Sequence, residues 1–193
     1  VAIALGGCAG PGGQDYVDRF VAAEPDLARL RVCHGYACAN ITEVAMSDRN
    51  WGRSGAAFEA RPGDAAADGM GIAQAVALTE PVGGPITGID DDAGRSSLLP
   101  ENEYQLDCVD ETVNTTTYLR AMEQRSLFLF HRVAPAARRG YVVDGWPHNT
   151  AVLEEIATGD MYTVDSWFHA NGALPEVVPL DLGLAGWSPD ASG

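Results

Sequence analysis

The chain has 193 residues, of which 46% are hydrophobic and 20% charged, a composition typical of one globular domain and too apolar for a disordered protein. Acidic residues outnumber basic residues 27 to 12, the formal net charge is −15, and every basic residue is an arginine. A chain without lysine has neither a Schiff-base lysine nor a P-loop lysine, and the negative charge argues against nucleic acid as a partner.

The amino-terminal residues resemble the end of an export signal. A short apolar run leads into Leu-Gly-Gly-Cys8, the pattern of a bacterial lipoprotein cleavage box. We expect residues 1–7 to be the remnant of a signal peptide, Cys8 to carry the lipid, and residues 8–30 to form a Gly/Pro-rich tether to one domain over 31–193. The protein would then lie at the bacterial cell envelope, facing the periplasm, with the lipid on Cys8 as its only link to the membrane. The alternative is an ordinary apolar tail with an incidental cysteine.

Two further cysteines, Cys33 and Cys38, enclose a short segment that contains Gly35. Glycine eases a tight turn, so a disulfide could close this loop in an oxidising compartment. Two free buried thiols are one alternative. A zinc site is another, but Cys33, His34 and Cys38 supply three ligands at most and no second ligand pair completes four. We therefore predict a disulfide and no metal.

Two amphipathic helices are expected next along the chain. Residues 43–60 carry apolar side chains at helical spacing, with Ser47 as a possible N-cap, and residues 65–80 are rich in alanine with Ile72 and Val76 on one face. Prolines and glycines then end the helical pattern after Pro81.

The acidic run that begins at Asp90 is a candidate calcium-binding loop. Such a loop needs oxygen ligands at positions one, three and five and glycine at position six. With Gly94 at position six, Ile89 and Ala93 stand at positions one and five, so the pattern fails. A solvated turn is the expectation, and a weak cation site is the alternative.

The second half of the chain predicts one helix followed by strands. The helix begins at or beside Cys108, with acidic residues in its first turn. Beyond Arg125 the pattern changes to one typical of strands. The predicted strands run from Leu127 to Val133, Tyr141 to Asp144, Thr150 to Ile156 and Met161 to Phe168. Thr158-Gly159-Asp160 predicts a hairpin turn. Helices followed by an antiparallel sheet give an α+β fold.

Cys108 is the candidate nucleophile. The amino end of a helix stabilises a thiolate through its free N–H groups and its dipole, although the neighbouring acids oppose this. A histidinium would offset them, and His148, at the start of a strand, is the best placed of the four histidines. The predicted hairpin brings Asp165 back beside His148, where a carboxylate could orient the ring. A buried structural cysteine with a hydrogen-bonded histidine is the alternative.

A family resemblance supports the catalytic interpretation. Three stretches carry it: the cysteine at a helix start, His148 followed by Asn-Thr-Ala-Val-Leu-Glu-Glu, and Gly159-Asp-Met-Tyr-Thr-Val-Asp165-Ser-Trp. They resemble the transglutaminase-like core of the papain superfamily, over roughly residues 105 to 168. The motifs Cys-His-Gly-Tyr-x-Cys, Gln-x-Asp-Cys-x-Asp and Trp-Pro-His are similar to those of bacterial transglutaminase-like cysteine proteinases. The resemblance implies a Cys-bearing helix packed on an antiparallel sheet that bears His and Asp.

The expected function is an exported cysteine peptidase, amidase or acyl transferase that acts on a peptide or protein amide without a cofactor. Cys108, His148 and Asp165 would form its triad. Gln105, three residues before the nucleophile, could donate an N–H to the oxyanion, or it could be a loop residue facing water. The alternative function is a non-catalytic envelope scaffold or binding domain that keeps this fold.

Overall fold

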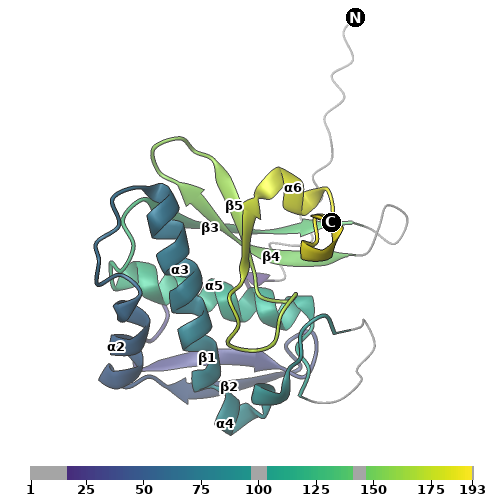
Figure 1. The fold of residues 1–193 in the computed structure, drawn as a ribbon. Helices are drawn as coiled ribbons and strands as arrows, with labels where there is room; N and C mark the ends of the chain where they lie inside the picture. Colours follow the sequence, from purple (N-terminus) through teal and green to yellow (C-terminus); the bar gives the residue numbers. More distant parts are fainter. Residues whose placement is uncertain (1–16, 97–103, 141–146, 193) are drawn as a thin grey trace, which may run out of the picture.

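The computed structural model describes residues 17–96, 104–140 and 147–192. The predicted signal remnant, Cys8 and the predicted strand from Tyr141 to Asp144 lie outside these ranges. Within them, a two-stranded hairpin comes first, then helices, then a four-stranded sheet (Figure 1). The regular elements are β1 (Arg29–His34), β2 (Asn40–Ala45), α2 (Asp48–Ala56), α3 (Ala65–Thr79), α4 (Gly84–Thr87), α5 (Cys108–Gln124), β3 (His131–Arg139), β4 (His148–Glu155), β5 (Met161–Asp165), β6 (Glu176–Pro179) and α6 (Leu180–Leu184), with short 3-10 turns at Glu80–Val82, Ile89–Asp91 and Pro189–Ser192.

The antiparallel hairpin of β1 and β2 was not predicted from the sequence. Its strands pair from Arg29 with Ala45 to His34 with Asn40, and its inner side chains are buried under α5. The described part of the expected tether also packs on the domain. Val17 and Val21 are buried beside Val113 of α5, so the folded part of the chain extends to the amino-terminal side of residue 31.

Local capping explains where the first two long helices begin. Ser47 caps α2 as predicted: its hydroxyl accepts from the N–H of Asn50, whose side chain accepts from the N–H of Ser47. Asp64 caps α3 by accepting from Ala67 N at 2.8 Å. Both helices lie within the residue ranges that the apolar spacing predicted.

Helix α5 is the centre of the fold and lies between the β1–β2 hairpin and the larger sheet (Figure 1). A capping box between Asp107, the N-cap directly before Cys108, and Asp110, two residues after it, starts the helix. The helix is almost wholly buried although much of it is polar. Thr112 and Thr116 tolerate this burial because their hydroxyls donate to the carbonyls of the preceding turn, at 2.7 and 2.6 Å.

The larger sheet is antiparallel with strand order β3-β4-β5-β6. Strand β3 covers His131–Arg139, later in the chain than the predicted strand from Leu127, and its pairing with β4 shifts between Ala134 and Ala137, around Pro135. The turn at Gly159, whose φ is +78°, joins β4 to β5 as predicted. The α+β class is therefore confirmed.

One hydrophobic core joins the helices to both sheets. Its largest fully buried members come from the hairpin, α3, the turn Ile89–Asp91, α5 and β4, and include Leu30, Ile72, Ile89, Leu119, Met122 and Leu153. Because this core holds α5 against β4, it fixes the amino end of α5 relative to the start of β4. No helix in the described ranges has both the length and the apolar character needed to cross a membrane.

Candidate active site

Cys108 is the first residue of α5 and is partly exposed. The cap satisfies the next two N–H groups, since the Asp107 carboxylate accepts from Val109 and Asp110 at 2.9 and 2.8 Å. The N–H of Cys108 takes no part in this cap. A partly exposed thiol at the positive end of a 17-residue helix is a favourable position for a thiolate.

His148 and Asp165 form a buried pair at the start of β4 and the end of β5. The His148 Nε2 atom lies 2.5 Å from Asp165 Oδ2, and both side chains are about 8% exposed. The backbone N–H of Trp167 donates to the other carboxylate oxygen at 3.3 Å, which fixes the carboxylate in turn. Since Nε2 is engaged, Nδ1 is the ring nitrogen left to exchange a proton with a thiol. The structure thus brings the three residues of the expected triad to one place.

The charge state of His148 follows from its surroundings. Burial lowers the pKa of the imidazole, but the hydrogen bond to Asp165, the side chain of Cys108 and the charges of both outweigh it and raise the pKa to about 9. The ring is therefore an imidazolium at neutral pH. In a Cys–His ion pair, a positively charged ring of this kind is the partner of the thiolate.

Aromatic rings enclose the imidazole. The rings of Trp167 and Phe168 lie 5.0 and 5.8 Å from that of His148, and Trp187 packs edge-on against Phe168. These three rings form an aromatic wall beside His148. The segment before α5 fixes the backbone of this wall, because Arg95 N donates to the Trp167 carbonyl at 2.6 Å. The wall keeps water from one side of the His148–Asp165 pair, which strengthens their interaction.

Asn149 is a site residue that the sequence reasoning missed. Its side-chain Nδ2 donates to Cys108 Sγ at 3.6 Å. Strand alternation sends neighbouring side chains such as those of His148 and Asn149 to opposite sides of β4, so alternation alone gives no signal for a site that includes both. At the end of the strand, however, the two side chains contact the same cysteine.

Gln105 lies buried just before α5, and its amide is engaged. Its Nε2 donates to the Asp91 carbonyl at 2.8 Å, and its Oε1 accepts from Ala93 N at 3.3 Å. The amide thereby ties the acidic turn to the start of α5, and its predicted role as an oxyanion donor stays a prediction. The turn itself is partly buried, because Asp92 is 3% exposed and accepts from Leu106 N at 2.8 Å.

The acids beside Cys108 oppose a thiolate less than the sequence suggested. Burial, followed by the charge of Asp107, raises the pKa of Asp110 to about 7, although three backbone N–H groups lower it. Burial also raises the pKa of Glu111 well above its usual value, helped by the charges of Glu80 and other nearby acids. A protonated carboxyl carries no charge, so the negative field at the helix start is weaker than a count of acids implies.

The predicted disulfide between Cys33 and Cys38 is present, and it lies against the same end of α5. The N–H groups of Tyr36 and Cys38 donate to the two oxygens of Asp110 at 2.8 and 2.7 Å. Four consecutive residues, 35–38, have positive φ, a conformation that costs energy for residues other than glycine. The disulfide and the Asp110 carboxyl together stabilise this loop.

Comparison of the chain with protein-family models, with curated proteins and with solved structures gave no match. The geometry of Cys108, His148 and Asp165 is therefore what points to a site.

Proposed function

We propose that the protein is a cysteine hydrolase or acyl transferase with a papain-like or transglutaminase-like arrangement of its active site. The observation that carries the proposal is the buried 2.5 Å contact between His148 and Asp165 next to a partly exposed cysteine at a helix start. A histidine ring that bonds a carboxylate through one nitrogen and lies beside a thiol has the arrangement of a catalytic base rather than of a purely structural histidine.

The proposed reaction follows from these positions. The Cys108 thiolate attacks an amide carbonyl, and the His148 imidazolium gives its proton to the nitrogen of the leaving amine. The product is a thioester on Cys108. Water or a second amine then attacks the thioester, His148 accepts the proton of that nucleophile, and the thiolate leaves. The N–H of Cys108 and the Asn149 amide are the nearest candidates to stabilise the oxyanion.

We propose that the protein works outside the cytoplasm, at the cell envelope. The Cys33–Cys38 disulfide supports this, because such bonds form and persist in oxidising compartments. A lipid on Cys8 and a peptide or protein amide as substrate are part of the same proposal. Fractionation of cells that express the protein, with Cys8→Ser as the matched variant, would test the anchor.

Thiol alkylation tests the nucleophile without a known substrate. Iodoacetamide should label Cys108 at pH 6.5 at least about tenfold faster than a free peptide thiol, because a free cysteine is largely protonated at that pH. Peptide mapping locates the label, and the disulfide protects Cys33 and Cys38. Labelling at the rate of a free peptide thiol would contradict the proposal.

Turnover requires a second assay. Peptide mixtures should show Cys108-dependent release of an amine, or Cys108-dependent incorporation of a fluorescent amine, and both should vanish in Cys108→Ser. A fast-reacting Cys108 with neither activity would favour the non-catalytic scaffold instead.

A further inference from the structure

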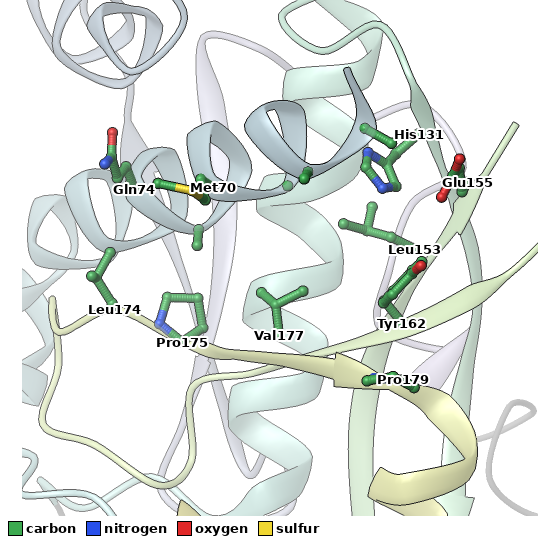
Figure 2. A pocket seen from close by; sticks show the side chains of 14 residues that line it. Met70, Gln74, His131, Leu153, Glu155, Tyr162, Leu174, Pro175, Val177 and Pro179 are labelled. Carbon is green, nitrogen blue, oxygen red and sulfur yellow. The ribbon is translucent and has the colours of Figure 1, made fainter. Parts of the chain in front are cut away.

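A second site lies between α3 and the larger sheet. It is a cavity of about 440 Å³, within the range of about 300–1,000 Å³ that is usual for small-molecule pockets (Figure 2). Ala66, Gly69 and Ala73 line it from α3, and their small side chains leave the space open. Leu153 and Val177 line it from β4 and β6.

This cavity is separate from the candidate active site. His131 lines the cavity at the start of β3 and pairs with Glu155, whereas His148 pairs with Arg139 at the other end of the same two strands. The two pairs are eight residue steps apart along β3, a distance of roughly 25 Å along the sheet.

Apolar side chains stand exposed around the cavity. Met70 is 66% exposed and Leu174 is 56% exposed, and both line it (Figure 2). Large exposed apolar side chains that gather around a concave site are typical of a binding surface. The body of a ligand held here would therefore be apolar.

Three polar side chains gather at one end, where Figure 2 shows His131, Glu155 and Tyr162 around Leu153, while Gln74 lies at the opposite end beside Met70. His131 Nδ1 lies 2.9 Å from Asp68 Oδ2, a carboxylate that is wholly buried and also accepts two backbone N–H bonds. The ring is thus held in one orientation, with Nε2 as the nitrogen left for a ligand.

The charge of this end is negative whichever form His131 takes. A protonated His131 neutralises Asp68 and leaves the charge of Glu155, while a neutral His131 leaves both negative charges. No arginine lines the cavity or forms an ion pair with Glu155 in the described part of the chain. Tyr162, at the same end, offers an aromatic ring to a cation.

We propose that this cavity binds a small molecule with an apolar body and an ammonium group. The apolar part lies between α3 and the sheet, and the ammonium group donates to the Glu155 carboxylate beside the Tyr162 ring. A carboxylate ligand of the same shape is repelled by Glu155, and a neutral one lacks the ionic contact.

Octylammonium, octanoate and 1-octanol test this proposal as matched probes. The protein is labelled with carbon-13 at its methionine methyl groups, and each probe is titrated to millimolar concentration while NMR follows the four methyl signals. We expect octylammonium to shift the Met70 signal and to leave those of the buried Met46 and Met122 unchanged. Its dissociation constant should be at least about fivefold lower than that of either other probe.

Two variants and one control complete the test. Glu155→Gln should bring octylammonium to within about twofold of octanol, because the ionic contact is lost. Ala73→Phe should block all three probes by filling the cavity. Glu59→Gln removes an exposed acid that does not line the cavity and should change nothing.

Equal or tighter binding of octanoate would overturn the proposal, as would an unshifted Met70 signal or binding that survives Ala73→Phe. Because Cys108 alkylation is measured on the same samples, failure at this cavity is distinguishable from failure of the proposed catalytic site.

Discussion

Replacement of Asp165 by asparagine should make the reactivity of Cys108 sensitive to pH near neutrality. Asparagine keeps the shape of the side chain but removes the charge that holds His148 as an imidazolium. In the native protein, burial lowers the pKa of His148, and the contacts with Asp165 and Cys108 raise it to about 9. Without the carboxylate, that pKa should fall toward the ordinary value of 6.5.

The size of the effect follows from the two pKa values. At pH 7.5, about 97% of the imidazole is protonated with a pKa of 9 and about 9% with a pKa of 6.5, so the thiolate–imidazolium pair becomes up to about tenfold less populated. The initial rate of iodoacetamide alkylation from pH 5 to pH 10 reports the thiolate of Cys108, which near neutral pH is expected to come mainly from this pair. We expect the rate of the variant to fall most between about pH 6.5 and 9, the interval in which the two protonated fractions differ.

The matched control is Asp181→Asn, because Asp181 is an exposed aspartate in the first turn of α6. It should reproduce the native rate profile. Circular dichroism would show that both variants are folded. Superimposable profiles of the native protein and the folded Asp165→Asn variant would refute the reasoning and reduce Asp165 to an ordinary strand residue.

The remaining predictions concern stability. Burial is the main cause that raises the pKa of Glu80 to about 7, so its protonated form stabilises the fold fully below about pH 4.5 and this contribution is lost as the pH rises through 7. Urea denaturation should therefore show that Glu80→Gln gains up to about 3 kcal/mol over the native protein at pH 8 and little at pH 4.5, and equal differences at both pH values would contradict this. Replacing Cys33 and Cys38 by serine should lower the free energy of unfolding by about 2 kcal/mol, the chain-entropy value for so short a loop, and an unchanged midpoint in urea would count against it. Leu119→Ala, at a fully buried position of α5, should cost about 2–5 kcal/mol in the same assay, whereas the exposed Leu129→Ala should cost less than about 0.5 kcal/mol.

The sequence determined those features that depend on residues close together along the chain. Ser47 and Asp107 cap their helices through bonds to residues two or three positions away, so the helix starts could be read from residue order. The pair of His148 and Asp165 belongs to the same class. The turn at Gly159 sets the register of β4 and β5, and that register brings the two residues together.

The tertiary structure decided everything that depends on packing between distant segments. The β1–β2 hairpin carries no strong turn signal, because its loop combines four positive φ values with bonds to Asp110, more than 70 residues away. Only the common core brings the start of α5 to the start of β4, which places Cys108 beside His148 and Asn149. The cavity under α3, and the burial that raises the pKa of Glu80 and Asp110, likewise arise where separate elements meet. Local propensity carries no information about such contacts, because they form only when the whole chain has packed.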